Sequence, residues 1–573
     1  MRSSFDTTIQ RRMTVVLLFF LICIAALLAR LFTLQIVNHR EYSKLAANQH
    51  KVSEDIFPNR GTIFAQDKSG ALIPLAFNKI QKNLVASPKH VEDTEAAVEI
   101  ISRELGLEKQ IIREKLSKKE DTYEVIAKKL DPEWAEKLES LLPSGFFFEE
   151  ERRRIYPHNT LGAQLIGFAS VEEQEEVGRY GIERIYNEHL SGEKGFLQGA
   201  KDASGFLVAI ARRIINPPKN GSDIVLTLDY NIQARAEEVL AGVVKKWNPS
   251  SGSLLVLDPR TGRILAEAVY PSFDINEFSK VKNYSTFLNP LVESMYELGS
   301  VLKPVTMAAA LNENAVTPSS TYVDSGEVKI GGYTIKNFDL KAYQTQTMTQ
   351  VIEKSLNTGM VHTARALGKE KQLEYFKRFG FGEKTGVDLP GEVAGNISNL
   401  DARRDIDFAT ASFGQGIAVT PIQLVSAIAS IANDGKMMKP YAVDRIVDDS
   451  GNEFKTKPEI KREIISPETA EELTKMLVST VKNSFENRAS VKGYFVAGKT
   501  GTAQVPKSDG RGYSDRVIHS FVGYAPAFDP RFLIYLQINE PTGNRFAANT
   551  LTPAFHDLAQ FILNYYEVPP DEK

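Results

Sequence analysis

The stretch LLVLDPRTGRILAEAV, residues 254–269, decides the fold class of this chain. Its first four residues are all apolar, and the Asp-Pro-Arg-Thr-Gly segment at 258–262 is typical of a turn. A second strand-like run follows from Arg263 to Val269. Two β-forming runs joined by a short turn predict a β hairpin.

A second strand pair is predicted near the C-terminus, at Ser520–Tyr524 and Phe532–Ile538. An apolar run at Asp223–Asp229 and an amphipathic helix at Asn231–Trp247 precede the hairpin, and Thr552–Tyr566 has the pattern of a closing helix. Mostly helical patterns lie between the two strand sets. This order predicts an α+β fold, with one antiparallel sheet flanked by helices.

Length and composition set broad limits on function. The chain has 573 residues, which is enough for two to four domains, and its formal net charge of -3 argues against nucleic acid as a partner. The single cysteine, Cys23, excludes a disulfide within one chain and a thiolate metal site. The eight histidines form no H-x-H or H-E-x-x-H pair, so we expect no metal site.

The N-terminus predicts a membrane anchor. Met13 to Val37 is an apolar run of 25 residues, against the roughly 20 that cross a bilayer as a helix. The arginines before it predict a cytoplasmic tail at 1–12 and an extracytoplasmic remainder. A cleaved signal peptide is the alternative, but Ala29-Arg30-Leu31 does not fit a small-x-small cleavage site.

The region after the anchor divides at a turn-rich segment. Residues 38–220 mix charged helical stretches with short apolar ones, and Ala96–Leu130 has a helical pattern with many Lys and Glu residues. The segment Pro217 to Gly221 is a strong break. We therefore expect one domain at 38–220 and a second domain at 221–573.

Ser300-Val301-Leu302-Lys303 is the first of three chemical motifs. On a helix, residues i and i+3 share one face, so this spacing places a lysine amine beside a serine hydroxyl. A lysine whose pKa is lowered by burial can accept the serine proton, and the alkoxide then attacks a carbonyl. The motif predicts a serine nucleophile with a lysine base.

The second motif is Ser355-Leu356-Asn357, and the third runs from Gly498 to Thr502. In the second, the hydroxyl can relay a proton to a leaving amine and the carboxamide can hold a substrate backbone group. In the third, a peptide can lie along the strand edge while Lys499, Thr500 and Thr502 bind a carboxylate. Small Gly501 leaves room for that peptide.

Each motif alone has look-alikes that we interpret as structural: Ser191/Lys194, Ser279/Lys282, Ser479/Lys482, Ser450-Gly451-Asn452 and Lys384-Thr385-Gly386. Residues 493–500 also match the phosphate-binding pattern G-x-x-x-x-G-K-[ST]. Bulky β-forming residues fill its four variable positions, and Gly501 and Pro506 prevent a following helix. A nucleotide site is therefore disfavoured.

Together, the three motifs in this order resemble the set found in penicillin-binding proteins and serine β-lactamases. The wider sequence is similar to the class B penicillin-binding proteins, the monofunctional transpeptidases that cross-link peptidoglycan. Thr500 and the segment Ser412 to Gly416 resemble the cell-division branch. The other matching segments are Arg60–Ile63, Arg154–Pro157, Gly181–Glu183, Thr261–Ala266 and Gly498–Gln504.

The resemblance implies an elongated pedestal domain at 38–220 and a transpeptidase domain at 221–573. It implies that Ser300 attacks the penultimate D-alanine carbonyl of a stem peptide, with Lys303 as base and Ser355 as proton relay. The remaining implied site residues are Asn357, which orients the peptide, and Lys499, Thr500, Gly501 and Thr502, which bind its terminal carboxylate.

The resemblance further implies that no metal or organic cofactor is needed. Its implied partners are peptidoglycan stem peptides, β-lactam antibiotics, the cytoplasmic membrane, a membrane glycosyltransferase and other division proteins. The implied location is the bacterial inner membrane, crossed once, with the catalytic domain outside.

Three alternatives stay open at this point. The same acyl-enzyme can be hydrolysed, as in a D,D-carboxypeptidase or a β-lactamase, and Glu353 is the nearby candidate for the deacylation base. The chain can also be a non-catalytic scaffold of a wall-synthesis complex, although three intact motifs disfavour this. A transmembrane antibiotic sensor is disfavoured by the short cytoplasmic tail.

Overall fold

The computed structural model describes residues 3–40, 42, 51–172, 175–200, 213–507 and 512–572. Its contacts divide the chain into two compact units. The first comprises Met1–Asn59 and Gly192–Asn220, and the second comprises Arg60–Ser191 and Gly221–Lys573.

The first unit contains helix α1 (Ser3–Phe32), which continues as a π-helical turn at Thr33–Val37. Arg11–Val37 has a mean hydropathy of 2.9 and is the one segment in the described chain that is long and apolar enough to span a membrane. The predicted anchor at 13–37 lies inside it. The unit also holds an antiparallel sheet of β1 (Lys51–Ile56), β8 (Gly195–Ala200) and β9 (Arg213–Asn216).

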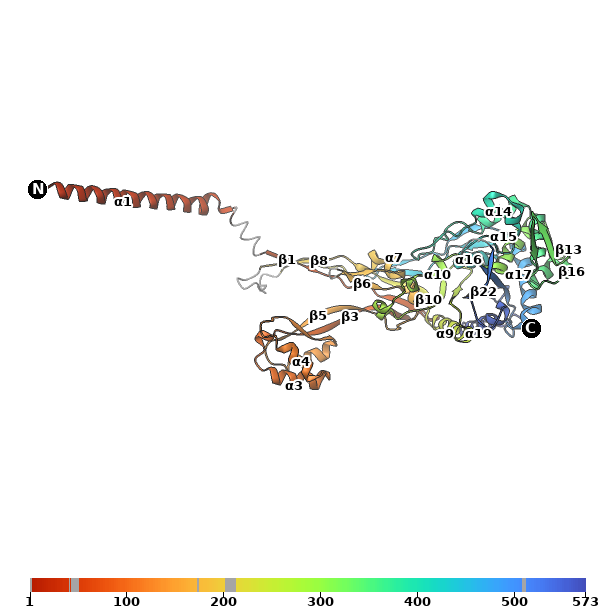
Figure 1. Ribbon diagram of the computed structural model, residues 1–573, viewed down its shortest axis with the longest axis horizontal. Coiled ribbons are helices and arrows are strands. Elements are labelled where there is room, and N and C mark those ends of the chain that lie inside the picture. Colours follow the sequence, from red (N-terminus) through yellow and green to blue (C-terminus); the bar gives the residue numbers. More distant parts are fainter. Residues whose placement is uncertain are drawn as a thin grey trace. The chain divides into compact units, whose positions relative to one another are not determined.

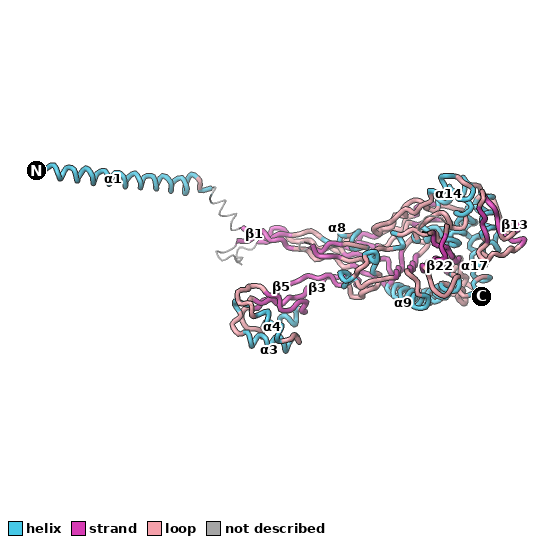
Figure 2. Tube along the Cα trace, in the orientation of Figure 1, coloured by secondary structure: helices cyan, strands magenta, loops and turns pink. Residues whose placement is uncertain are grey.

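In the second unit, a small lobe forms around the long strand β3 (Leu72–Ala86), which pairs with β4 (Glu124–Leu130) and β5 (Phe146–Ile155). Figures 1 and 2 show its helices gathered beside β3 and β5. These helices are α3 (Thr94–Leu105), α4 (Lys109–Leu116) and α5 (Pro132–Glu139). The helical prediction for Ala96–Leu130 is wrong in its last part, because Glu124–Leu130 is a strand. Pairing with β3 buries Ile126 in the core of this lobe.

A buried ion cluster fastens the segments that lead from this lobe toward the larger sheet. Glu183 accepts hydrogen bonds from Arg60 Nε at 2.7 Å and from Arg154 Nε at 2.8 Å, and its side chain is fully buried. Arg154 also donates to the carbonyl of Gly61. Three segments that are distant in sequence therefore meet at one carboxylate.

The main sheet confirms the predicted antiparallel core. Its strand order is β12-β11-β23-β22-β21, and all neighbouring strands are antiparallel. The predicted hairpin corresponds to β11 (Ser251–Leu257) and β12 (Ile264–Tyr270), and the C-terminal pair to β22 (Tyr513–Ala525) and β23 (Phe532–Asn539). Strand β21 (Ala497–Pro506) forms one edge.

Each face of this sheet packs against helices, because alternate side chains point to opposite faces. Leu254 and Val256 belong to the core beneath α9 (Tyr230–Trp247) and α19 (Thr552–Tyr565), two helices that lie side by side in Figure 1. Leu255 and Leu257 point into the larger core on the opposite face. That core includes α11 (Lys303–Asn312), α16 (Pro421–Ala432) and α17 (Pro467–Asn483).

A second sheet spans the predicted domain boundary. Strand β10 (Asp223–Asp229) pairs in parallel with β2 (Ile63–Gln66) and antiparallel with β18 (Val443–Val447). Strand β2 also pairs with β3, so strands from before and after residue 220 belong to the same sheet. This pairing accounts for the grouping of residues 60–191 with the C-terminal region.

Short elements complete the second unit. Two small hairpin-like sheets, β13 (Thr321–Asp324) with β16 (Gln344–Thr347) and β14 (Glu327–Ile330) with β15 (Tyr333–Lys336), precede α12 (Met348–Glu353) and α13 (Asn357–Leu367). The remaining elements are α6 (Ala163–Ile166), β6 (Ala169–Glu172), β7 (Glu175–Gly178), α7 (Gly181–Ile185), α8 (Asn187–Ser191), α10 (Pro290–Glu293), α14 (Lys369–Arg378), α15 (Asp405–Ala411), β17 (Lys436–Met438), β19 (Glu453–Lys455), β20 (Ile460–Glu463) and α18 (Ala547–Thr550).

Candidate active site

Ser300 lies in a single 3₁₀ turn, Gly299–Leu302, directly before helix α11. Side chains at i and i+3 eclipse one another in 3₁₀ geometry, so Ser300 and Lys303 lie on the same side of this turn. Pro304 occupies the first turn of α11, where its missing N–H costs least. Ser300 is partly exposed, whereas Lys303 is completely buried. The first motif thus combines a partly exposed serine with a buried lysine, and the bonds of that lysine run to Ser355 and Asn357.

Gly299 allows the Ser300 turn to lie against strand β21. Its φ of +63° is in the left-handed region, which favours glycine. A Cβ atom at this position would lie 3.1 Å from the Cβ of Ala503. The Gly299 N–H donates to the carbonyl of Gly414 at 3.0 Å, and any side chain at Gly414 would collide with Gly299. The segment around Gly414 therefore supports the turn from the other side.

Lys303 joins the first motif to the second. Its Nζ donates to the Ser355 carbonyl oxygen at 2.6 Å and to Asn357 Oδ1 at 2.9 Å, and it lies 3.1 Å from Ser355 Oγ. Burial, reinforced by the positive charge of Lys499, holds the pKa of Lys303 well below its usual value. A lysine in this state can act as a base near neutral pH.

Ser355 occupies the tight turn between α12 and α13, with a φ of +56°. Such a left-handed conformation costs a serine about 1 kcal/mol or more and needs support from its surroundings. Asn357 begins α13, and its Nδ2 donates to the carbonyl oxygen of Lys336 at 2.9 Å. The turn therefore presents the hydroxyl and the carboxamide to the same amine.

Strand β21 supplies the third motif. Lys499 is 1% exposed, and its Nζ donates to Ser355 Oγ at 3.0 Å. Burial lowers the pKa of Lys499 to about 7. Ser355 Oγ therefore lies between two lysine amines that reach it from different elements.

The rest of the third motif lines the same strand. A Cβ at Gly501 would lie 2.7 Å from the carbonyl oxygen of Leu298, so only glycine lets β21 lie this close to the Ser300 turn. Thr502 Oγ1 accepts a hydrogen bond from the Ala547 N–H, and Thr500 is partly buried. Among the described strands, β21 pairs only with β22, so its other edge can hold an extended peptide.

Within the described residues, neither Lys303 nor Lys499 forms an ion pair with a carboxylate at hydrogen-bonding distance. Over the same part of the chain, no cluster of His, Cys, Asp and Glu could hold a metal ion. The functional groups that the three motifs supply are two amines, the hydroxyls of Ser300 and Ser355, and the carboxamide of Asn357. Such a set suits acyl transfer through a serine.

Several contributors to the site carry no sequence motif. Beside Asn357, three further residues form hydrogen bonds at the start of α13. The Lys336 carbonyl accepts from Asn357, and Asp324 accepts from both Asn337 and Thr358. His519 is fully buried opposite Thr502 in the β21–β22 register and bonds to Thr550. Only the three-dimensional arrangement identifies these residues.

The look-alike motifs lie apart from this arrangement or have structural contacts. Ser479 lies within α17 and hydrogen bonds to Glu353, whose carboxylate also accepts from Asn483. Ser191 ends α8 and accepts a hydrogen bond from Arg60. In the second Lys-Thr-Gly segment, the Thr385 N–H donates to Glu392. Glu353, the candidate deacylation base, therefore has its hydrogen-bond partners on α17.

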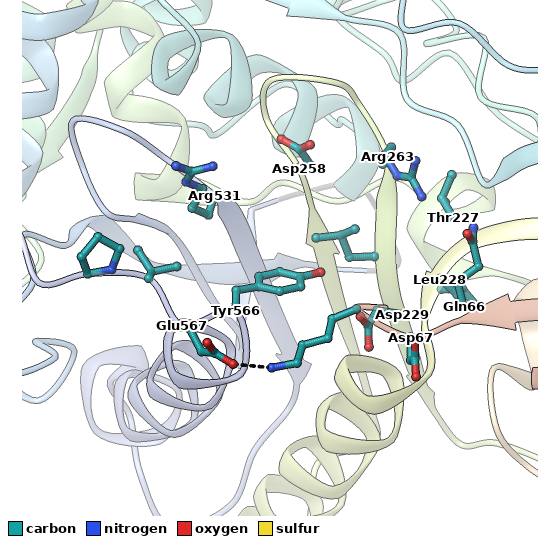
Figure 3. A pocket seen from close by; sticks show the side chains of 14 residues that line it. Gln66, Asp67, Thr227, Leu228, Asp229, Asp258, Arg263, Arg531, Tyr566 and Glu567 are labelled. Carbon is teal, nitrogen blue, oxygen red and sulfur yellow. Dashed lines mark hydrogen bonds and ion pairs between the residues drawn. The ribbon is translucent and has the colours of Figure 1, made fainter. Parts of the chain in front are cut away.

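The phosphate-loop match is contradicted by the fold, because Lys499 and Thr500 lie within strand β21 and no helix follows them. A cavity of about 600 Å³ lies elsewhere in the second unit, and none of the predicted catalytic residues lines it (Figure 3). Lys68, which lines this cavity, forms an ion pair with Glu567. The cavity is therefore distinct from the candidate active site.

Comparison with protein families gives two matches in chain order. Residues 55–226 match the penicillin-binding protein dimerisation domain, and residues 252–560 match the penicillin-binding protein transpeptidase domain. The second match alone covers more than half of the chain.

Among curated proteins, the chain is 31% identical over 571 residues to stage V sporulation protein D of Bacillus subtilis (strain 168), covering 99% of this chain and 87% of that protein. It is 29% identical to peptidoglycan D,D-transpeptidase FtsI of Escherichia coli (strain K12), covering 96% and 91%. The crystal structure of penicillin binding protein 2X from Streptococcus thermophilus has a similar fold, with a TM-score of 0.79 at 24% identity over 90% of this chain and 81% of that one.

Proposed function

This chain belongs to the class B penicillin-binding proteins, and we propose that it cross-links peptidoglycan through an acyl-enzyme formed on Ser300. It is a serine D,D-transpeptidase of the cell-division type. The observation that carries the assignment of residues is the meeting of Lys303 and Lys499 at Ser355 Oγ, beside the turn that bears Ser300.

In the first step, neutral Lys303 accepts the proton of Ser300 Oγ, which attacks the carbonyl carbon of the penultimate D-alanine. Backbone N–H groups of Ser300 and Thr502 stabilise the negative charge that develops on the carbonyl oxygen. The proton then passes through Ser355 to the nitrogen of the last D-alanine as the C–N bond breaks. The products are an ester on Ser300 and free D-alanine.

In the second step, an amine of a neighbouring stem peptide attacks the ester carbonyl. The amine loses a proton to Lys303, and the Ser300 oxygen regains one as the ester bond breaks. A new peptide bond thereby joins two stem peptides, and the enzyme returns to its starting state. β-Lactams acylate Ser300 in the same way as the donor peptide.

Lys499, Thr500 and Thr502 bind the terminal carboxylate of the donor peptide, and Asn357 orients the peptide. Gly501 does not make room for the peptide, as the sequence suggested; it lets β21 lie close to the Ser300 turn, because a Cβ there would meet Ser520 and Leu298. A carboxylate near Lys499 favours the charged form of this lysine, whose pKa of about 7 in the empty site makes it responsive to a bound anion. The anionic donor thus supplies a countercharge for Lys499, which forms no ion pair within the described residues.

The protein is single-pass, with α1 as its membrane span. We place residues 1–12 in the cytoplasm and the catalytic domain outside the inner membrane, because the arginines lie before the span. The proposed domains are a pedestal at 38–220 and a transpeptidase domain at 221–573. A membrane glycosyltransferase and other division proteins are the proposed partners.

Transpeptidation is favoured over hydrolysis by the contacts of Glu353. Its carboxylate accepts hydrogen bonds from Ser479 and Asn483 on α17, and neither of these belongs to the candidate site. We expect the penicilloyl adduct to persist for many minutes, as measured by intact-mass spectrometry after removal of free penicillin. Rapid return of the unmodified mass would support a β-lactamase instead.

The proposed nucleophile is tested by labelling the full-length protein in detergent with a fluorescent penicillin. We expect Ser300→Ala to abolish the fluorescent band, while Ser479→Ala, the matched Ser-x-x-Lys control, keeps it. Labelling that survives Ser300→Ala would refute the assignment.

A further inference from the structure

A buried carboxylate lies next to the start of α13, the helix that Asn357 begins. Asp324, the last residue of β13, is fully buried and lies outside the motifs of the proposed mechanism. Its two oxygens accept hydrogen bonds from four donors: the N–H groups of Gly326 and Tyr343, Thr358 Oγ1 and Asn337 Nδ2. This set of donors suits an ionised carboxylate and binds it to three separate segments.

Asn337 connects Asp324 to the segment that contacts Asn357. Its Nδ2 donates to Asp324 at 2.8 Å and to the Lys341 carbonyl at 3.1 Å, while its Oδ1 accepts from the Thr358 N–H at 3.3 Å. With only 2% of its surface exposed, the side chain has little freedom to reorient. The peptide group that joins Lys336 to Asn337 is therefore held in place.

The Lys336 carbonyl in turn fixes the orientation of the Asn357 carboxamide. A carbonyl oxygen can only accept, so Asn357 must direct its Nδ2 toward Lys336 and its Oδ1 toward Lys303. Thr358, which follows Asn357 in the chain, is bonded to both Asp324 and Asn337. The same pair of buried side chains thus holds both sides of Asn357.

This orientation bears on the base, because a neutral amine has two hydrogens and one lone pair. The Ser355 carbonyl and Asn357 Oδ1 are both acceptors, and they take the two hydrogens of Lys303. The lone pair is then left for the serine hydroxyls. A reversed carboxamide would offer N–H groups to Lys303 and compete for that lone pair.

On the basis of the proposed function, we propose that Asp324 and Asn337 are positioning residues that set the direction of the Lys303 lone pair through Lys336 and Asn357. They touch no substrate atom. Their contribution is to keep the carboxamide of Asn357 in the one orientation that leaves the base free to accept the Ser300 proton.

The test measures the second-order rate constant of penicillin acylation for the full-length protein in detergent, between pH 5 and 10. Asp324→Asn replaces an acceptor by an N–H donor and is expected to lower the plateau rate about 10- to 100-fold. Losing the Asn357 acceptor destabilises the ammonium form of Lys303, so the rising limb of the profile moves to lower pH. Lys499 is the charged group that faces Lys303 in the described chain, and this variant leaves it unchanged.

A double-mutant cycle separates positioning from general damage. If Asp324 acts through Asn357, Asp324→Asn has little further effect once Asn357→Ala is present. Asn337→Ala should move the rising part of the pH profile in the same direction, and its effect should likewise not add to that of Asn357→Ala. It replaces Asp324→Asn in the test if that variant does not fold. Asp339→Asn is the matched control, because this exposed carboxylate bonds to Tyr343 and Lys341 without reaching Asn337.

The proposal is overturned if the single variants lower the plateau without moving the limb, or if their effects multiply fully with Asn357→Ala. These results differ from failure of the proposed function, which would appear as wild-type protein that forms no penicilloyl adduct.

Discussion

Two groups of buried charges in this molecule have opposite compositions. In the pedestal segments, Arg60 and Arg154 share the carboxylate of Glu183. At the candidate active site, the buried amines of Lys303 and Lys499 meet at the hydroxyl of Ser355, and in the described residues neither pairs with a carboxylate. Burial disfavours charge in both places, but the first group contains its own countercharge and the second does not.

The presence or absence of a countercharge distinguishes the Glu183 cluster, which has a structural role, from the two lysines, which can take part in catalysis. Burial alone would raise the pKa of Glu183, and the two arginines outweigh it, so its pKa lies below the usual range. In the cleft, burial and like charge act in the same direction and lower the pKa of Lys303. A paired cluster keeps its charges and holds segments together, whereas an unpaired one releases protons and can do acid–base chemistry.

The largest expected effect comes from removing the proposed base. Lys303→Met keeps the side-chain volume but has no lone pair, and we expect the acylation rate constant for penicillin to fall about 10³- to 10⁴-fold. The thermal midpoint should stay the same or rise, because the free-energy cost of burying an ionisable amine has been removed. Lys354→Met is the control, since this lysine bonds to Gln346 on the outer side of the same turn.

For the Glu183 cluster we expect the opposite result, a loss of stability without a loss of acylation rate. Glu183→Gln leaves two buried arginines without a countercharge and should destabilise the protein by about 3–5 kcal/mol, measured by denaturant or thermal unfolding. The acylation rate of molecules that remain folded should be unchanged. Glu188→Gln, an exposed change in the next helix, is the control. Equal stability of the two variants would remove the structural role of the cluster.

Lys499→Met is expected to have an intermediate effect on catalysis. Loss of the carboxylate-binding cation should lower the acylation rate constant about 100-fold, mainly through weaker initial binding of penicillin. Stability should not fall. A variant that binds and acylates like the wild type would place the carboxylate elsewhere in the cleft.

The smallest effect is on the pH dependence of stability. The pKa of Lys499 is about 7 when folded and near 10.4 when unfolded, so the unfolded state binds more protons between these values. Stability contributed through this group therefore rises with pH over that window, by about 1 kcal/mol per pH unit. The wild type should gain more stability than Lys499→Met between pH 7 and 9; parallel curves would contradict the lowered pKa.

The sequence predicted those parts that follow from local pattern or from motif spacing. Two β-forming runs joined by a turn predicted β11 and β12, and the three motifs predicted Lys303, Ser355, Asn357 and Lys499, which meet through hydrogen bonds in the structure. Ser300 was predicted on a regular helix and lies in a 3₁₀ turn before it.

Other parts depend on long-range packing and had no local signature. Arg60 and Glu183 are separated by 123 residues, and the local sequence around either residue does not predict that they form an ion pair. Asp324 and Asn337 lie in short polar strands and loops whose pairing with α13 only the fold reveals. Glu124–Leu130 has a charged, helix-like composition, and its pairing with β3 overrides that local preference.

The most direct test of the central claim is the pH profile of Ser300 acylation by penicillin in the wild-type protein. Buried, unpaired Lys303 predicts a rate constant that rises and levels off well below pH 10, with the adduct mapped to the peptide that contains Ser300. A rate that stays low until about pH 10, where an ordinary lysine loses its proton, would contradict this account.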